Sequence, residues 1–420
     1  MGTFYQGNTI TTIHDLYSIM ERDRYEQMLE TRLEEFSRHK NIALLLPSLY
    51  SEIHVPGVLD RIIREINRTS YVKQVAVALG GTEDRKKFME ARDYFNRLRQ
   101  ACGEVKVIWV DGPGMQTLFR KLEKRGFTVG VKGKGQSVWA ALGYLLAREE
   151  TDVICLHDCD IVTYDRLLLG RLLYPVANPN NNFEFCKGYY ARISPKDFSM
   201  KGRVTRLFIY PFLDVWIDIM KKRGDQNMEN FFRFHREFFY PLAGEFCFST
   251  QLARGINFAS NWGLEVSTLS EVYRRLSLHK IVQIDIAENY EHKHQELSPE
   301  DANSGLHRMV LDIACFFFNH ARAHGHEITG AFCRMMMESY YHTGLKYVKR
   351  FCEDADANCL SFDRFEEERT VSDFAGFMGR VWDDIRDGSR RTQIPSWNRV
   401  AYSCPEIYKE IIEAVDQDNI

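Results

Sequence analysis

Four short, largely apolar runs alternate with helix-patterned segments in the first 157 residues, and this alternation limits the possible folds more than any other feature. The runs are Asn41–Leu46, Val72–Leu79, Val105–Val110 and Val153–His157. Runs of this kind are typical of strands that are buried on both faces of a parallel sheet. The segments with helical spacing are 55–66, 83–102 and 137–148. The alternation predicts right-handed βαβ units and therefore an α/β fold.

In an open parallel sheet, ligands bind beyond the carboxyl ends of the strands. The segments that follow the four predicted strands are 47–52, 79–84, 111–115 and 158–160. We therefore expect these four segments to meet at one site.

The sharpest chemical signal is Asp158-Cys159-Asp160, directly after the fourth strand. Residues at i and i+2 of an extended backbone point the same way, so both carboxylates can converge on one ligand. Carboxylate oxygens suit Mg²⁺ or Mn²⁺, and these ions keep positions open for diphosphate oxygens. A simple turn is the alternative, because Asp is common where strands end. The position after the fourth strand favours a metal-dependent site for a nucleoside diphosphate.

A second signal is Lys132-Gly133-Lys134-Gly135, which precedes a predicted helix. Glycines let the backbone approach an anion, and a helix N-terminus with a nearby lysine stabilises its charge. A solvated turn would give the same short pattern. The segment lacks the GxxxxGK[ST] spacing of a P-loop, which argues against a P-loop ATPase.

The composition argues against several classes of protein. The formal net charge is only −3, so it gives no support for nucleic acid or an anionic membrane as the main partner. No stretch approaches the roughly 18 consecutive apolar residues of a membrane span, and the first residues lack the pattern of a signal peptide. The ten cysteines show no zinc-binding or CxxC spacing and indicate reduced thiols. We therefore expect a cytoplasmic protein without a membrane span.

The pattern divides the chain into three segments. Residues 1–38 show roughly helical spacing and predict a helical N-terminal segment. Residues 39–300 contain the α/β region, and residues 301–420 predict a helical C-terminal extension. We expect the last 30 residues of this extension to be partly irregular around Pro395 and Pro405.

Three long segments of the extension, 303–324, 328–354 and 371–388, have helical spacing. Many aromatic residues also fall between Phe208 and Phe248, where a thick core, a sugar-stacking surface or a subunit interface would each explain them. The helical extensions and this aromatic stretch together suggest a homodimer.

Several motifs occur in an order that resembles the retaining glucosyl-3-phosphoglycerate synthases, which are glycosyltransferases of the GT-A fold. The motifs are Pro47, Glu52, GKG at 133–135, DCD at 158–160, GRVT at 202–205, PLAGE at 241–245 and His292-Lys-His294. The resemblance covers about residues 40 to 300. Mannosyl-3-phosphoglycerate and mannosylglycerate synthases are related possibilities.

The resemblance implies a metal-dependent enzyme that moves a hexose, glucose in the first instance, from an NDP-sugar to 3-phosphoglycerate. UDP-glucose, GDP-glucose and GDP-mannose remain open as donors, and Mg²⁺ or Mn²⁺ as the cofactor. Residues 39–165 would form the donor half of the catalytic domain and residues 166–300 the acceptor half.

The resemblance also assigns roles to individual residues. It implies donor binding by Pro47, Leu49, Glu52, Lys134, Asp158 and Cys159. It implies acceptor binding by Gly202, Arg203, Thr205 and His294. It implies metal binding by Asp160 and His292, and catalytic roles for Asp158 and Glu245.

Several of these residues also have a structural explanation that involves no ligand. Arg203 offers a planar fork for a phosphate or carboxylate, but a surface charge would look the same. Glu245 lies in an aromatic stretch, where a structural ion pair would also explain a buried carboxylate. His292 and His294 follow an apolar run and suit metal ligation, although most histidines are not ligands.

The chain departs from the family pattern at several points. Cys159 replaces a hydroxyl residue, His294 replaces an amide, and Gly-Gly-Thr-Glu-Asp follows Leu79 in place of an Asp-Ser-rich turn. Two other classes remain as alternatives. A sugar nucleotidyltransferase needs a basic glycine-rich loop after the first strand, and Pro-Ser-Leu-Tyr-Ser-Glu has no basic residue there. A non-catalytic sugar-binding protein would not need the two aspartates and His292.

Overall fold

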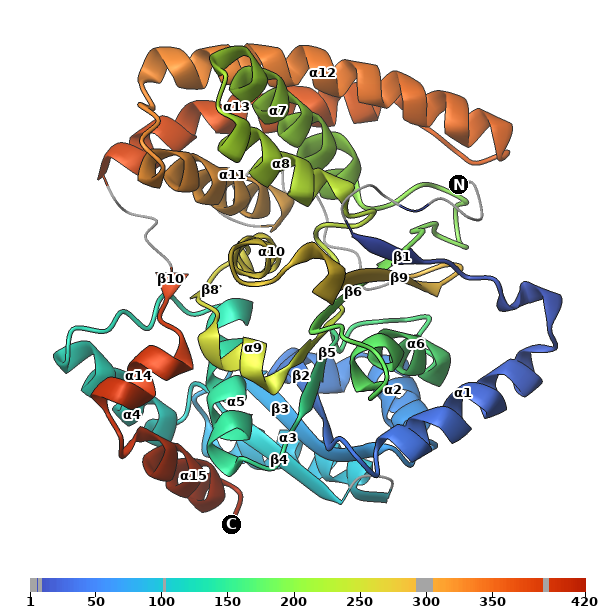
Figure 1. Cartoon of the computed structure of the whole chain (residues 1–420), viewed down its shortest axis with the longest axis vertical. Helices are drawn as coiled ribbons and strands as arrows, with labels where there is room; N and C mark the ends of the chain where they lie inside the picture. The colour runs from blue at the N-terminus through green and yellow to red at the C-terminus, as the bar shows by residue number, and fades with distance from the viewer. Residues whose placement is uncertain (1–5, 7–9, 101–102, 292–304, 388–392) are drawn as a thin grey trace.

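The computed structural model describes residues 6, 10–100, 103–291, 305–387 and 393–420. An eight-stranded sheet with helices on both faces forms one part of the molecule, and a bundle of helices forms a separate layer beside it (Figure 1). The chain returns from the bundle to the sheet, so its C-terminal end lies at the opposite end of the molecule from the bundle. The predicted α/β architecture with helical extensions, as in the GT-A fold, is confirmed.

The sheet has the strand order β1-β9-β6-β7-β5-β2-β3-β4. The strands are β1 (Thr11–Ile13), β2 (Ile42–Leu49), β3 (Val72–Gly80), β4 (Glu104–Trp109), β5 (Val153–Leu156), β6 (Phe185–Tyr190), β7 (Phe246–Ser249) and β9 (Ile281–Ala287). All neighbouring strands are parallel except at β7, which runs antiparallel to both β5 and β6. The four predicted strands are confirmed as β2, β3, β4 and β5.

Helices cover both faces of the sheet. Side chains of successive strand residues point to opposite faces, so each strand contributes to two hydrophobic cores. Ala43 and Leu45 of β2 belong to the core beneath helix α5 (Lys134–Arg148), whereas Leu44 and Leu46 belong to the core on the other face. The helices of this part are α1 (Arg22–Phe36), α2 (Val58–Ile66), α3 (Arg85–Phe95), α4 (Pro113–Lys124), α5 (Lys134–Arg148) and α6 (Arg166–Ala177). Short 3₁₀ turns complete it at Tyr17–Ile19, Tyr50–His54, Asn96–Gln100 and Leu278–Lys280.

The predicted helices over 55–66, 83–102 and 137–148 correspond to α2, α3 and α5. Helix α4 was not predicted, because Asp111-Gly-Pro-Gly114 reads as a turn. The structure places Pro113 in the first helical turn, where its missing N–H and fixed φ are tolerated.

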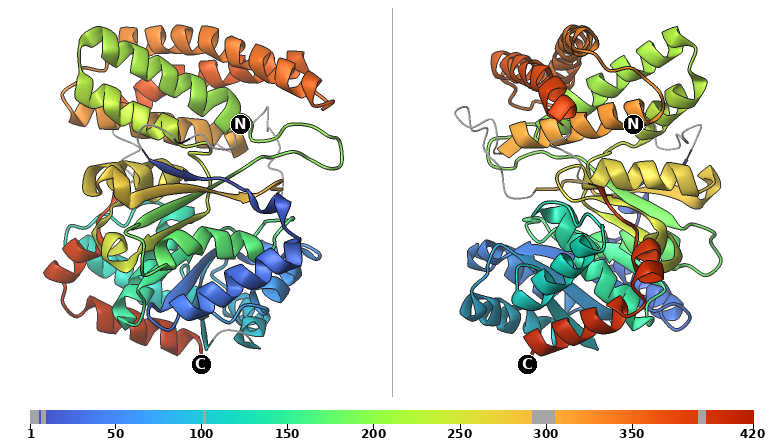
Figure 2. Two further views of the ribbon diagram at one scale, coloured as in Figure 1. Left: turned by 45° about the vertical axis from the view of Figure 1, so that its right-hand side comes forward. Right: turned by 90° about the vertical axis from the view of Figure 1, so that its left-hand side faces the viewer.

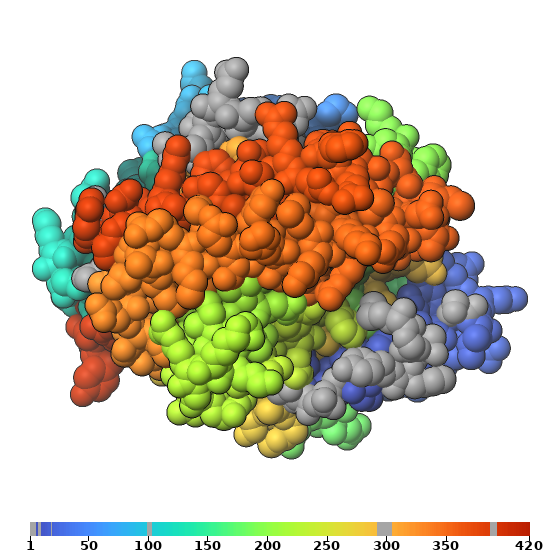
Figure 3. Space-filling view, turned by 90° about the horizontal axis from the view of Figure 1, so that it is seen from above, coloured from blue at the N-terminus to red at the C-terminus, as the bar shows by residue number. Residues whose placement is uncertain are grey.

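The helical bundle combines segments that lie far apart in the sequence. It contains a π-helix (Val204–Ile209), α7 (Tyr210–Arg223), α8 (Gln226–Glu237), α11 (Gly305–Ala323), α12 (Gly330–Ala357) and α13 (Arg364–Asp387). These elements share one hydrophobic core, with Trp216 and Phe318 among its buried residues. Figure 3 shows how α11–α13 and the α7–α8 pair together cover this end of the molecule.

The bundle crosses a boundary that the sequence had suggested. We expected the helical extension to begin at residue 301, yet α7 and α8 pack with it in the same bundle (Figure 2). The aromatic stretch from Phe208 is therefore largely core: Phe208, Phe212 and Phe232 are fully buried.

The segment after the bundle packs on the sheet. Its elements are β10 (Gln393–Ile394), α14 (Trp397–Ser403) and α15 (Ile407–Asp418), and β10 pairs with β8 (Phe258–Ala259). Helices α9 (Thr250–Gly255) and α10 (Leu264–Arg275) flank β8. Trp397 is buried against α5, where its ring stacks on Trp139 with centroids 4.2 Å apart. The expectation of a partly irregular end around Pro395 and Pro405 is confirmed, because both prolines lie outside α14 and α15, which form most of this segment.

The N-terminal expectation also needs correction. Residues Thr11–Ile13 form an edge strand that pairs in parallel with Val282–Ile284 of β9, and α1 begins only at Arg22. A three-residue strand is too short to show an alternating pattern. In the described parts of the chain, no helix has the length and apolar character needed to cross a membrane.

Candidate active site

A large pocket of about 1430 Å³ lies at the carboxyl edge of the sheet and extends to the bundle. Its lining includes residues from all four predicted strand ends, at 47–52, 80–84, 110–111 and 158–160. The expectation that these strand ends meet at one site is confirmed. The far side of the pocket is lined by residues 199–205, by Trp262 and Glu265, by the start of α11 and by the link before α13.

Asp158, Cys159 and Asp160 follow β5 and alternate in direction. The two aspartates are partly exposed to the pocket, whereas Cys159 is only 3% exposed and packs into the core. Burial raises the pKa of the Cys159 thiol well above its usual value. The two carboxylates therefore share one face, and the residue between them has a packing role.

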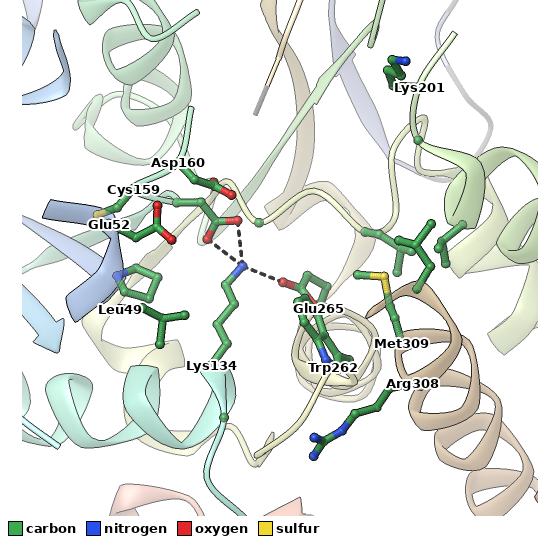
Figure 4. A pocket seen from close by; sticks show the side chains of 18 of the residues that line it. Leu49, Glu52, Lys134, Cys159, Asp160, Lys201, Trp262, Glu265, Arg308 and Met309 are labelled. Atoms are coloured by element: carbon green, nitrogen blue, oxygen red, sulfur yellow. Dashed lines mark hydrogen bonds and ion pairs between the residues drawn. The ribbon is translucent and has the colours of Figure 1, made fainter. Parts of the chain in front are cut away.

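Lys134 lies between two acidic side chains (Figure 4). Its Nζ is 2.7 Å from Oδ1 of Asp158 and 3.0 Å from Oε1 of Glu265. Burial alone would lower the pKa of Lys134, but the charges of Asp158 and Glu265 outweigh it and raise the pKa. The GKG segment is thus not a solvated turn, because its lysine is fixed in the pocket.

Gly135 explains how this segment reaches the pocket. A Cβ atom at position 135 would lie 1.9 Å from the carbonyl oxygen of Ala259, so only glycine allows α5 to begin this close to β8. Lys132 also lines the pocket but pairs with other carboxylates, with its Nζ 2.6 Å from Glu83 and 3.2 Å from Asp111.

Asp160 lies in an acidic environment that suits a cation. Burial, together with the nearby charge of Asp158, raises the pKa of Asp160 to about 7. The nearby charge of Glu52 acts in the same direction on the pKa of Asp160, and Figure 4 shows the two side chains close together. Oxygen donors of this kind fit Mg²⁺ or Mn²⁺. Among the described residues, however, no group of three or more His, Cys, Asp or Glu side chains could hold a metal.

The predicted ligand His292 and the predicted acceptor residue His294 lie outside the described residues. The described chain ends on this side at Glu291, whose backbone N–H donates to Thr163 Oγ1 across 3.0 Å. Thr163 lies three residues after Asp160, so the segment that leads to His292 approaches the aspartates.

The other predicted donor residues line the same pocket. Pro47, Leu49 and Glu52 lie at the end of β2 and in the turn after it. Leu49 is 54% exposed, so an apolar surface is available on this side of the pocket.

Glu245 is fully buried and does not itself line the pocket. Its Oε1 accepts a hydrogen bond of 2.5 Å from Tyr290, and its Oε2 accepts one of 2.8 Å from Tyr190. The two tyrosine rings stack with centroids 3.8 Å apart, and both line the pocket. Burial and the charge of Asp158 raise the pKa of Glu245. Glu245 is therefore connected to the pocket by its hydrogen bonds with Tyr190 and Tyr290.

The predicted acceptor residues Gly202, Arg203 and Thr205 line the side of the pocket nearest the bundle. Gly202 has φ +75°, and a Cβ atom there would lie 2.9 Å from the hydroxyl of Tyr240. Arg203 precedes the π-helix, an irregular helical turn often found at functional sites. Its guanidinium is ion-paired with Glu366 and Glu367 of α13, so it is not a simple surface charge.

Several pocket residues were missed from the sequence. They are Tyr190, Arg192, Tyr240, Trp262, Glu265, Tyr290, Arg308, Glu366 and Glu367. Five of them lie in helices or in strand β6 and the other four in connecting segments, where single polar or aromatic residues carry no local signal. Glu265 alone offered a hint, because a glutamate in an otherwise apolar helical turn needs a partner.

Comparisons with known proteins find two relatives of similar length that share one name. The chain is 39% identical over 420 residues to glucosyl-3-phosphoglycerate synthase from Persephonella marina, covering 100% of this chain and 99% of that protein. It is 36% identical over 424 residues to glucosyl-3-phosphoglycerate synthase from Methanococcoides burtonii, covering 99% of this chain and 98% of that protein. No family model matches the chain.

Among solved structures, the chain resembles a crystal structure of glucosyl-3-phosphoglycerate synthase from Mycobacterium tuberculosis in complex with Mn²⁺, uridine diphosphate and glucosyl-3-phosphoglycerate. The two share 20% sequence identity with a TM-score of 0.48, over 69% of this chain and 83% of that one.

Proposed function

Since this chain belongs to the glucosyl-3-phosphoglycerate synthases, we propose that its large pocket is where a glucosyl group passes from a nucleoside-diphosphate-glucose to 3-phosphoglycerate. The enzyme is a metal-dependent glycosyltransferase. The observation that carries the proposal is that Asp158 and Asp160 line the same pocket as Gly202, Arg203 and Thr205. Donor and acceptor can therefore meet without a large rearrangement of the chain.

The donor occupies the side of the pocket at the ends of β2 and β5. Pro47, Leu49 and Glu52 border the base and ribose, and Cys159 supports this side from the core. Lys134 lies near the nucleotide, and Asp158 lies beside the ribose or sugar. Lys134 is held by Asp158 and Glu265, which gives its charge a defined position before a diphosphate arrives.

Asp160 and His292 would hold a Mg²⁺ or Mn²⁺ ion together with the donor diphosphate. A bound divalent ion stabilises negative charge on a departing diphosphate. The raised pKa of Asp160, which burial and the charge of Asp158 cause, supports a cation at this position.

The acceptor occupies the side of the pocket next to the bundle. Arg203 offers a planar fork to a phosphate or carboxylate. Gly202 and Thr205 supply a backbone N–H and a hydroxyl, and His294 makes a further contact. The positive φ of Gly202 lets the backbone turn here, close to Tyr240.

Transfer proceeds with retention of the anomeric configuration by front-face attack. The acceptor hydroxyl gives its proton to an oxygen of the leaving diphosphate, while Asp158 orients the donor. Glu245 acts as a positioning residue, because both of its oxygens accept hydrogen bonds from Tyr190 and Tyr290. These tyrosines would present a fixed polar wall to the sugar hydroxyls. Positioning and electrostatics then supply most of the rate acceleration.

The full-length relatives favour glucosyl transfer over the alternatives. Both are named glucosyl-3-phosphoglycerate synthases, which supports neither a mannosyl-transferring enzyme nor a sugar nucleotidyltransferase. UDP-glucose is the proposed donor, with GDP-glucose and GDP-mannose as the donors to exclude. We also propose that the protein is cytoplasmic and that it forms a homodimer. Light scattering would measure the mass of the assembly in solution.

The proposal is tested by nucleoside diphosphate release. UDP-glucose, GDP-glucose and GDP-mannose are each incubated with Mg²⁺ or Mn²⁺, with and without 3-phosphoglycerate or glycerate. We expect release from UDP-glucose that requires 3-phosphoglycerate and stops with EDTA. Release without an acceptor, or formation of NTP from pyrophosphate, would contradict the proposal.

A further inference from the structure

Two adjacent carboxylates of α13 meet the arginine that the proposed function assigns to the acceptor. Arg203 Nη2 is 2.7 Å from Oε1 of Glu366, and Arg203 Nε is 3.2 Å from Oε1 of Glu367. All three residues line the pocket. One edge of the arginine fork is therefore already covered by carboxylate oxygens.

The two glutamates differ in burial and in their partners. The Glu367 side chain is 6% exposed and also pairs with Arg206, at 2.9 Å from Oε2 to Nη1. The Glu366 side chain is 50% exposed and pairs with Arg203. A buried carboxylate held by two arginines is costly to move, whereas an exposed one can turn to solvent at little cost. Glu367 therefore orients the arginines, and Glu366 is the movable partner.

The backbone around Glu366 is fixed to the acceptor side of the pocket. The N–H of Ser361, in the link before α13, donates to the carbonyl of Phe198 across 2.9 Å, and Ser199 forms a β-bridge with Ser361. Residues 198 and 199 lie just before Gly202. Because the two segments are joined, rotation of the Glu366 side chain is the simplest way to uncover Arg203.

From this arrangement we propose that Glu366 sets the affinity for the acceptor by occupying the edge of Arg203 that an anionic acceptor group takes. This inference rests on the proposed function, because it requires Arg203 to bind the acceptor. Two arginines and two glutamates balance to zero net charge in the free enzyme. An incoming phosphate or carboxylate displaces Glu366 from Nη2, while Glu367 keeps the guanidinium in place. Part of the acceptor's binding free energy is thus spent on breaking this ion pair.

The test compares Glu366→Gln with Glu368→Gln. Both remove one negative charge from the same turn of α13, but Glu368 pairs with Arg364 at 2.7 Å and does not line the pocket. We expect Glu366→Gln to lower the KM for 3-phosphoglycerate by roughly two- to fivefold, the range for one half-exposed ion pair. The kcat and the KM for UDP-glucose should stay unchanged, and Glu368→Gln should match the wild type in all three constants.

A direct binding measurement complements the kinetics. Calorimetric titration of 3-phosphoglycerate into the enzyme saturated with UDP and Mn²⁺ should show the same fall in Kd for Glu366→Gln. An unchanged or higher KM and Kd would overturn the inference, since Glu366 would then orient Arg203 or do nothing. Equal decreases in KM and Kd for Glu366→Gln and Glu368→Gln would also overturn it. Such decreases would come from the loss of one negative charge on α13, and not from the release of Arg203. Wild-type enzyme that transfers nothing to 3-phosphoglycerate would instead overturn the proposed function.

Discussion

Replacing Gly244 with alanine tests how closely the Asp158–Lys134 pair is packed. A Cβ atom at position 244 would lie 2.6 Å from Oδ2 of Asp158 and 2.8 Å from Nζ of Lys134. An ordinary contact needs at least 3.4 Å. The two side chains would therefore have to move by about 0.8 Å and about 0.6 Å, because repulsion rises steeply below contact distance.

A shift of this size matters more for catalysis than for folding. Misplacement of a group in an active site by about 1 Å can lower the rate by about a hundredfold. We expect Gly244→Ala to lower kcat/KM by roughly 10- to 100-fold. The fold should tolerate the change, since Gly244 is not among the glycines with positive φ and polar side chains can absorb the contact. Restricting the unfolded chain even favours alanine by about 0.4–1 kcal/mol.

The assay is acceptor-dependent UDP release, with thermal unfolding measured on the same samples. Gly376→Ala is the matched control, because a Cβ atom at this exposed position of α13 meets nothing within 4 Å. This control should keep wild-type kcat/KM and gain about 0.5–1 kcal/mol of helix stability. Wild-type kcat/KM in Gly244→Ala would refute the argument that the pair must stay in place. A much lower Tm in that variant would refute the argument that side chains absorb the contact.

Two further predictions concern stability. Trp397→Ala should lower the free energy of unfolding by about 3–5 kcal/mol, as for other buried tryptophans, because the ring stacks on Trp139 and is 2% exposed. Urea titration checks this value, and Tyr402→Ala, at a side chain 91% exposed in the same helix, should change it by less than about 0.5 kcal/mol. Burial lowers the pKa of His235 from 6.5 to about 4, so this histidine stabilises the fold above pH 6.5 and the stabilisation is lost as the pH falls toward 4. About 2 kcal/mol should be lost by pH 5, and a His235→Gln variant whose urea midpoint falls as steeply from pH 7 to 5 as that of the wild type would contradict the assignment.

Strands β2 to β5 could be predicted because each is an apolar run long enough to be recognised. β2 and β3 are buried on both faces, which leaves a continuous apolar pattern in the sequence. β1 has only three residues, and β6 and β7 include Lys187 and Ser249, so no clear pattern marks them. Lys187 is buried because its Nζ donates to the carbonyl of Ala243 across 2.6 Å, a contact that no local pattern reveals.

The site was predictable where the sheet topology alone brings residues together. Asp158 and Asp160 could be located because they end a strand, and the carboxyl ends of parallel strands meet at one edge. The partners of Arg203 could not, because Glu366 and Glu367 lie more than 160 residues later, on a helix whose packing depends on tertiary contacts. The packing of α7 and α8 against α11–α13 could not be predicted for the same reason. The sequence of an amphipathic helix does not specify which helix will cover its apolar face.

The route of the chain through the molecule has a consequence for its synthesis. Helices α14 and α15 follow the bundle in sequence but cover α4 and α5 at the other end of the molecule (Figure 1). A ribosome makes the N-terminal part first, so the apolar face of α5 around Trp139 stays uncovered while the whole bundle is translated. Chaperones that recognise exposed apolar surface can bind this face throughout that interval. A nascent chain that stalls before Trp397 keeps the apolar face of α5 exposed. Chaperones can therefore distinguish it from the complete chain.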